Sequence, residues 1–536
     1  MQSPIRCSSC RGVSFESNKV HSDPFAMKSI SFAEEVARGN SMSRHLSSLQ
    51  RSLSKASSHY CDLVLDVDDD EEESEVEDLE MQTMQKQPVL IHEQQPKKVN
   101  KARKQGSRLS IILLDQGLFT VYKRLFIVCL ALNITTLVLA ATGNFPYGRK
   151  RATLFSIANI LALTLCRSEA FLRIVFWFAV KALGHSWVPL SVKTATTSLL
   201  QSLGGVHSGC GVSSIAWLVY ALVLTLNDSQ NTSPEIVGVA AAILGLLFLC
   251  SLAAFPLVRH LHHNVFERAH RFAGWTALGL LWAFIVLTIS YDADTKSYHT
   301  TNLFSNLIKQ QEFWLTITIT ALIIFPWLTT RRVPVTISAP SGHASIIKFQ
   351  GGVKAGLLGR ISPSPLSEWH AFGIISDGNK DHMMLAGAVG DFTKSLVSNP
   401  PSHLWVRQVH FAGLPYLVNM YERVLVVATG SGICVFLSFL LQPSAAEVRF
   451  IWVAKGIEQN FGKEIKDMVS GYPKDKVTVH DTGVLGRSNV SEMSVEAAKE
   501  WGAQVVIVTS NPEGSRDVVS ACKAAGIPAF GPIWDS

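Results

Sequence analysis

A turn with two glycines separates an apolar strand-like run from a helical run in the last quarter of the sequence. The stretch from 423 to 441 reads RVLVVATGSGICVFLSFLL, with Gly430 and Gly432 in the turn. Glycine lets the backbone approach a phosphate group at the N-terminus of the helix that follows, where free N–H groups and the helix dipole favour anions. The pattern therefore predicts a phosphate-binding turn at Gly430 and Gly432.

A second stretch, 368–396, carries several notable residues in order and reads EWHAFGIISDGNKDHMMLAGAVGDFTKSL. It resembles the flavin site of the ferric reductase and NADPH oxidase superfamily. In that superfamily Glu-Trp-His-Pro-Phe-Thr begins the flavin contact, and Val-Gly-Asp-Trp-Thr closes the next strand. The resemblance implies an FAD site at His370 and Phe372.

Three positions of this stretch bear on how FAD would be held. Gly373 stands where the family has threonine, and Gly387 stands where it has an arginine that meets the flavin pyrophosphate. Lys394, just after the Gly-Asp-Phe-Thr turn, can replace some of the missing positive charge. The resemblance therefore implies descent from a flavin-binding protein in which two of the flavin contacts have changed.

The same resemblance extends to the C-terminal region. The family's pyridine-nucleotide motif reads Gly-x-Gly-x-x-Pro, so NAD(P)H is implied at Gly430 and Gly432, with Val435 in place of the proline. The family's Cys-Gly-Pro turn, which places a thiol beside the nicotinamide, corresponds to Ser510 and the two residues after it. Serine donates a hydrogen bond but lacks the polarizable sulfur. Trp534 is expected either to stack on the flavin, as C-terminal aromatic residues do in the family, or to cover the edge of the domain.

Two histidines are candidate haem ligands by the same resemblance. His207 lies in GGVHSGCG and His270 in ERAHRFAGW, each four residues before a glycine that would let a flat macrocycle approach. Imidazole is an axial haem ligand. The family uses two histidines per span, and the second of each pair is missing, so at most one haem is predicted. The alternative is that both are helix-end histidines bonded to headgroups or loop carbonyls.

Four short segments place the chain closest to one group of this superfamily. GGVHSGCG, HRFAG, IEQNFGKEI and GPIWDS resemble the fungal TmpA-type integral membrane proteins, divergent relatives of the ferric reductases. The same membrane and reductase-like unit also ends some adenylate-forming proteins. The resemblance covers roughly residues 110 to 536 and implies a membrane flavin oxidoreductase.

The elements that must position these residues begin with membrane helices. Of the 536 residues 47% are hydrophobic, and the mean hydropathy is +0.22. A spanning helix needs roughly 20 apolar residues. Six segments meet this length, near 121–142, 152–182 (interrupted by Arg167 and Glu169), 196–226, 235–257, 271–291 and 312–330.

The basic residues indicate how the spans are oriented. They gather at the ends of the apolar runs, which places both termini in the cytosol, with Arg149 to Arg151 as the exception. The net charge of +6 is modest, and the basic residues lie mainly beside the predicted spans. We therefore expect a multi-pass integral membrane protein with membrane lipid as a partner and no nucleic acid.

Composition divides the chain into four regions. Residues 1–108 hold an acidic run and a basic run with little apolar content, which predicts a disordered cytosolic tail. Residues 109–332 form the transmembrane helical bundle. Short alternating runs at 333–400 predict a flavin-binding-like antiparallel β-barrel. At 401–536, β-rich runs alternate with helical segments, which predicts an open parallel α/β, NAD(P)-binding-like domain.

Two functions remain open from the sequence. The first is a membrane-bound flavin-type oxidoreductase that transfers electrons from NAD(P)H through FAD to a small-molecule acceptor at or in the membrane, with one haem as an optional relay. The alternative is a catalytically weakened, reductase-like membrane protein with a signalling or scaffold role. The changes at the family's threonine, arginine, proline and cysteine positions favour this alternative.

Overall fold

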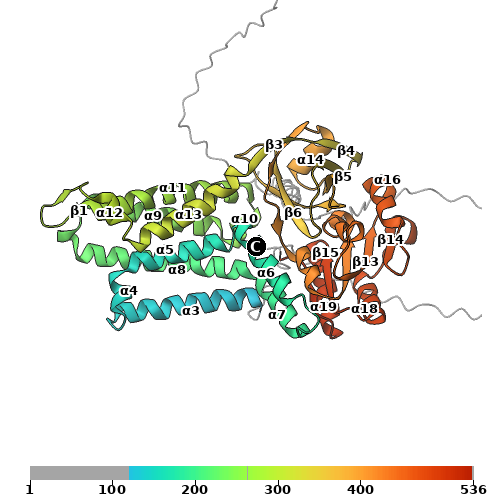
Figure 1. Ribbon diagram of the computed structural model, residues 1–536, viewed down its shortest axis with the longest axis horizontal. Helices are drawn as coiled ribbons and strands as arrows, with labels where there is room; N and C mark the ends of the chain where they lie inside the picture. Colours follow the sequence, from blue (N-terminus) through green and yellow to red (C-terminus); the bar gives the residue numbers. More distant parts are fainter. Residues whose placement is uncertain (1–119, 262, 534–536) are drawn as a thin grey trace, which may run out of the picture. The chain divides into compact units, whose positions relative to one another are not determined.

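Long apolar helices occupy the first half of the described chain. The computed structural model describes residues 120–261 and 263–533, so the predicted tail and Trp534 lie outside the described residues. Within that range five helices are long and apolar enough to cross a membrane: α3 (Val121–Ala141), α8 (Leu203–Asn227), α9 (Pro234–Ala253), α11 (His263–Ser290) and α13 (Gln311–Leu328). Four of them, α8, α9, α11 and α13, lie side by side with the shorter α5 (Ala152–Leu165) in one bundle (Figure 1).

Glycines allow a close contact between α8 and α3. A Cβ atom on Gly205 would lie 2.2 Å from the carbonyl oxygen of Tyr122, and one on Gly209 would lie 2.9 Å from Cβ of Cys129. Only residues without a side chain allow α8 to approach α3 this closely. Small residues serve this purpose between membrane helices, where packing replaces the hydrophobic effect as the source of association.

The single span predicted over 152–182 is wrong. The chain forms α5, of 14 residues, and α6 (Glu169–Leu183), of 15 residues, with a turn at Cys166–Ser168 between them. Ser168 caps α6, because its side-chain oxygen accepts a hydrogen bond from the N–H of Phe171. A helix of 14 residues is about 21 Å long, which is short of the roughly 30 Å hydrocarbon core. Among the described residues five helices, not the predicted six, therefore have spanning length.

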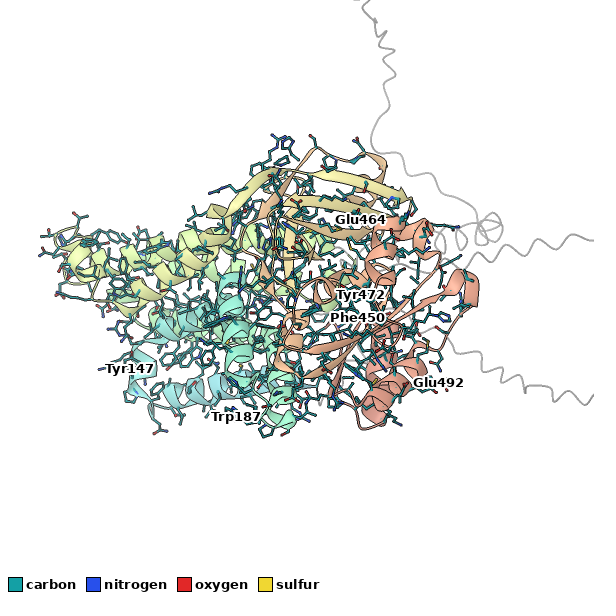
Figure 2. All side chains as sticks on the ribbon, turned by 45° about the vertical axis from the view of Figure 1, so that its right-hand side comes forward. Tyr147, Trp187, Phe450, Glu464, Tyr472 and Glu492 are labelled. Atoms are coloured by element: carbon teal, nitrogen blue, oxygen red, sulfur yellow. The ribbon has the colours of Figure 1, made fainter. Side chains whose placement is uncertain are left out.

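Helix α6 packs on the β region that follows the bundle. Phe176 and Ala179 on its inner face are buried in one core with residues of the β-sheets. After α6 the chain passes Trp187, which is 77% exposed (Figure 2), and enters α7 (Leu190–Gln201). From α7, Gln201 Nε2 donates to the carbonyl oxygen of Gly531 at 3.0 Å. These contacts join the helical part to the C-terminal half.

Short elements connect the helices. They are α4 (Pro146–Lys150), η1 (Ser229–Asn231), α10 (Pro256–Leu261), β1 (Tyr291–Asp292), β2 (Ser297–Tyr298) and α12 (Leu303–Leu307).

Antiparallel strands follow α13, as the alternating runs predict. One sheet contains β3 (Thr330–Pro334), β6 (Leu357–Ser362), β7 (His370–Gly373), β10 (His403–Arg407) and β11 (Phe411–Ala412). The other contains β4 (Thr336–Ser341), β5 (Ala344–Gln350), β8 (Ile375–Ser376) and β9 (Asp381–Gly387), followed by α14 (Asp391–Ser398). The strand pairing gives two sheets, so closure into one barrel stays a prediction. These strands also run past residue 400, to Ala412.

The predicted parallel α/β domain is confirmed. Its five strands are all parallel and lie in the order β14-β13-β12-β15-β16. They are β12 (Arg423–Thr429), β13 (Glu447–Ala454), β14 (Val477–Asp481), β15 (Val505–Thr509) and β16 (Ala529–Phe530). The helical elements are η2 (Leu414–Met420), η3 (Gly430–Val435), α15 (Ser438–Leu441), α16 (Ile457–Ser470), α17 (Thr482–Leu485), α18 (Val490–Trp501) and α19 (Pro512–Ala524).

Apolar cores cover both faces of this sheet. Phe450 and Tyr472, both labelled in Figure 2, belong to the core on one face. That core continues into the antiparallel sheets through residues such as Ile346 and Leu385. The chain order reverses between β12 and β15, and in open α/β sheets ligands bind at such a switch point. This directs attention to the ends of β12 and β15.

Candidate functional site

A cavity of about 1560 Å³ lies where the helical bundle meets the antiparallel sheets and the α/β domain. Side chains of α3, α5, α8, α9, α11 and α13 form much of its wall. The remaining wall includes Trp369 and Ala371 beside β7, and Thr509 and Pro512 at the end of β15. The cavity therefore connects the membrane-type helices with the switch point of the parallel sheet.

Two histidines face each other in this cavity. The ring centroids of His207 on α8 and His270 on α11 lie 6.5 Å apart, and the ring planes make an angle of 48°. Nδ1 of His207 is 3.0 Å from the carbonyl oxygen of Leu163, and Nδ1 of His270 is 3.3 Å from that of Cys250. Because a carbonyl only accepts, each Nδ1 carries a proton and Nε2 is the metal-binding nitrogen of the neutral ring. The structure thus brings the two predicted haem ligands together.

The glycines that follow the two histidines are open toward the cavity. Gly211 and Gly274 line it, and a Cβ atom on either would meet no atom within 4 Å. A flat group can therefore approach the backbone of both helices. Within the described part of the chain, no group of three or more His, Cys, Asp or Glu side chains could hold a metal ion. The histidines are thus a candidate pair of axial ligands without further protein ligands around them.

A carboxylate and two arginines form the wall between the helices and the sheets. Glu169 Oε1 lies 2.5 Å from Nε of Arg360 on β6 and 2.8 Å from Nη1 of Arg407 on β10. The Arg407 guanidinium also lies over the Trp369 ring at 4.8 Å, and that of Arg360 lies over the Phe411 ring at 5.2 Å. All five line the cavity. One carboxylate between two guanidinium groups leaves this wall positively charged.

Sequence reasoning missed these two arginines. A signal was available, because Arg360 in LLGRIS and Arg407 in HLWVR are single charges within otherwise apolar strands. Charged side chains in buried strands nearly always have a partner. The partner, Glu169, lies more than 190 residues earlier in the chain, and sequence alone does not reveal the pairing.

The predicted nucleotide turn is tightly packed. All six residues of η3, Gly430 to Val435, are buried. A Cβ atom on Gly432 would lie 2.8 Å from the carbonyl oxygen of Thr509, and the Trp452 indole N–H donates to the carbonyl oxygen of Gly430 at 2.9 Å. Neither Gly430 nor Gly432 lines the cavity. Nucleotide binding at these glycines stays a prediction.

The strand predicted to contact the flavin is β7, and the face that carries His370 and Phe372 points away from the cavity. His370 is 3% exposed and stacks on Phe392 of α14 at 4.4 Å, and Phe372 packs against the same core. Side chains alternate along a strand. Accordingly Trp369 and Ala371 line the cavity, whereas His370 and Phe372 do not.

The two glycines that replace family residues are contact points with η3. A Cβ atom on Gly373 would lie 2.6 Å from both the backbone nitrogen and Cα of Val435, and one on Gly387 would lie 3.0 Å from Oγ of Ser431. The first contact involves backbone atoms, which rotation of a side chain cannot relieve. At Gly373, η3 therefore fills the space that the family's threonine would need.

Hydrogen bonds hold η3 and the residues after it against the sheets. Ser438 Oγ donates to the carbonyl oxygen of Ile374 at 2.7 Å and accepts from the N–H of Ser376 at 3.0 Å. Gln442 Nε2 donates to the carbonyl oxygens of Val353 and Ser376, both at 2.8 Å. Buried polar groups are thus satisfied across this interface. The closed packing is stabilised by several independent contacts.

Ser510 and Lys394 lie outside the cavity wall. Ser510 is buried, and its Oγ is 2.7 Å from Oγ1 of Thr429 across the ends of β15 and β12. The next two residues begin α19, with Asn511 as its N-cap and Pro512 in its first turn. Lys394 is exposed on α14. Among the predicted site residues that the structure describes, His207 and His270 are therefore the pair that meets in the cavity.

Comparison with known proteins relates the chain to fungal reductases. Residues 414–536 match the family described as adenylate-forming reductase 03009, C-terminal domain. Adenylate-forming reductase 03009 of Coprinopsis cinerea (strain Okayama-7) is 33% identical over 429 residues, and adenylate-forming reductase 06235 of the same fungus is 33% identical over 430 residues. Each alignment covers 79% of this chain and 41% of the relative. The chain thus spans less than half the length of these curated relatives.

Solved structures similar to part of the chain are also reductases. Phthalate dioxygenase reductase is 12% identical with a TM-score of 0.30, covering 38% of this chain and 68% of that protein. The ferredoxin-NADP+ reductase of Plasmodium falciparum with 2'P-AMP is 9% identical with a TM-score of 0.29, covering 38% of this chain and 94% of the other.

Proposed function

We propose that the chain is a membrane-bound flavin-type oxidoreductase that takes electrons from NAD(P)H and passes them to an acceptor at or in the membrane. Relatives named as reductases, 33% identical over 79% of the chain, support this proposal. The observation that carries it is the cavity, which reaches from Thr509 and Pro512 at the switch point to His207 and His270 in the bundle. One continuous space therefore adjoins both the domain expected to bind the nucleotide and the two histidines expected to hold a haem.

The flavin does not fit against the predicted strand face in this packing. Val435 closes on Gly373, and the side chains of His370 and Phe372 point into the core. The cavity wall offers an aromatic surface at Trp369 with the guanidinium of Arg407 above it. We assign the flavin ring to this wall. A flavin bound there would accept hydride and release single electrons.

One haem is the proposed relay. His207 and His270 fit this group, because each directs a protonated Nδ1 to a carbonyl and keeps Nε2 for the metal. The open backbone at Gly211 and Gly274 leaves space for the flat ring. A haem there would carry single electrons between the flavin and the acceptor. His207 and His270 are the residues that would hold it.

A second candidate function is a reductase-like membrane protein with a signalling or scaffold role. The contact between Gly373 and Val435 and the complete burial of η3 favour it. Under this alternative the closed packing is the permanent state, and neither a flavin nor a nucleotide enters. The two candidates differ in whether the purified protein consumes NADPH.

The test is NADPH oxidation and flavin content of the full chain in liposomes, with ferricyanide as an artificial acceptor. We expect turnover in the wild type and loss of both flavin and turnover in Trp369→Ala. Trp187→Ala is the matched control, because that indole is 77% exposed and lies outside the cavity wall. Wild-type protein without flavin or turnover would support the second candidate. Unchanged flavin content in Trp369→Ala would contradict our assignment of the flavin wall.

A further inference from the structure

Arg167 is a cavity-facing arginine whose charge is not matched by any residue that the structure describes. It lies in the turn between α5 and α6, lines the cavity and is exposed there. Its side chain forms no ion pair or hydrogen bond with any residue that the structure describes. The sequence shows it only as an interruption of an apolar run, and neither of the functions proposed above uses it.

The carboxylates in the described cavity wall are already paired. Glu169 lies between Arg360 and Arg407, and Glu267 forms an ion pair with Arg271. These are the two acidic residues of the described wall. Neither is available to Arg167.

An unmatched guanidinium at this site calls for an external anion. Arginine keeps its proton at any physiological pH, so Arg167 cannot become neutral by titration. A guanidinium that faces an apolar space without a counter-ion is costly, and an ionisable residue beside membrane helices is therefore expected to have a partner. Because the described residues supply none, we look to an external ligand for the anion.

The rest of the cavity is long and apolar. Its lining on α11 runs from Phe266 to Phe284, which corresponds to about 27 Å at roughly 1.5 Å per residue. Ile157, Leu281 and Ile319 also line it and belong to the apolar core of the bundle. A cation at one end of an elongated apolar space is complementary to a molecule with an acidic head and a hydrocarbon chain.

We propose that the cavity binds an acidic amphiphile, with its carboxylate or phosphate on Arg167 and its acyl chain along α11. A free fatty acid and an acidic phospholipid share this chemistry. The proposal does not depend on NAD(P)H oxidation. A haem held by His207 and His270 would also bring carboxylates to this region, so the test must separate the two occupants.

The experiment measures the thermal unfolding of the full chain in detergent with added oleate, dioleoyl phosphatidate or methyl oleate. A ligand that binds only the folded protein raises Tm. We expect Tm to rise by several degrees with oleate if the cavity binds a fatty acid, or with phosphatidate if it binds an acidic phospholipid. Methyl oleate, the neutral ester, should not raise Tm. Arg167→Gln should lose the rise, and Arg167→Lys should keep part of it. Arg124→Gln is the matched control, an exposed arginine on α3 outside the cavity wall.

A second variant tests the part of the cavity that would bind the acyl chain, and it leaves the charge of Arg167 unchanged. Gly274 lines the cavity with no atom within 4 Å of its missing Cβ, so Gly274→Leu fills space without a clash and should also lose the rise. An equal rise with methyl oleate, or an undiminished rise in Arg167→Gln, would overturn the proposal. So would wild-type protein with a Soret band and no response to either acid, because the anion would then belong to a haem.

Discussion

The backbone nitrogen and Cα of Val435 each lie 2.6 Å from the point where a Cβ atom on Gly373 would stand. Gly373→Ala should therefore force η3 away from β7 and lower the free energy of unfolding by about 1–3 kcal/mol, as overpacking of a core does. Chemical denaturation checks this. Gly342→Ala is the control, because a Cβ there would meet no atom within 4 Å. Equal stability of the two variants would show that η3 does not close on the strand.

The ion pairs of Glu169 should make a large contribution to stability. Its side chain is 10% exposed and lies between Arg407, which is 18% exposed, and Arg360, which is 35% exposed. Glu169→Gln leaves two partly buried guanidinium groups without a counter-ion, and we expect a loss of about 3 kcal/mol in the free energy of unfolding.

A surface pair provides the comparison for that variant. Glu458 and Lys466 form an exposed ion pair on α16. Exposed pairs are screened by water and salt, so Glu458→Gln should unfold at the same denaturant concentration as the wild type. If Glu169→Gln behaved in the same way, the bundle and the sheets would not be held together by this carboxylate.

Acid sensitivity should depend on a partly buried histidine between β10 and β11. Burial, together with nearby His382 and Arg173, lowers the pKa of His410 from 6.5 to about 4. Between these pH values the unfolded chain binds a proton at this group that the folded chain does not, so the free energy of unfolding falls as pH is lowered from 6.5 to 4.

The variant His410→Gln removes this group. Tm measured across that pH range should fall less steeply than in the wild type. The exposed His403 gives the control, and His403→Gln should keep the wild-type slope. A wild-type slope in His410→Gln would assign the acid sensitivity to other groups.

Local patterns were sufficient for much of the fold. The β-rich runs that begin with Arg423 predicted the parallel sheet, because strands covered on both faces are continuously apolar. The proximity of His207 and His270 was an expectation of the family resemblance, and the two residues lie at corresponding ends of two apolar helices.

Long-range contacts were not predictable in the same way. Gly373 and Gly387 were visible as departures from a family pattern, but their contacts with Val435 and Ser431 depend on how two sheets and η3 pack. Arg167 and Glu169 marked an interruption of the apolar run, but the apolar sequence on both sides favoured one continuous span over a turn at Cys166–Ser168. The pairing of Glu169 with two distant strands and the burial of Phe176 and Ala179 against the sheets explain why the chain leaves the bundle there.

The most direct test of the proposed function is the absorption spectrum of the detergent-purified protein before and after NADPH is added without oxygen. We predict a flavin band that bleaches and a Soret band that shifts. His207→Ala and His270→Ala should each lose the Soret band, whereas His185→Ala, an exposed histidine stacked on Trp187, should retain it. Wild-type protein with neither band, or a Soret band retained in both cavity variants, would contradict the account.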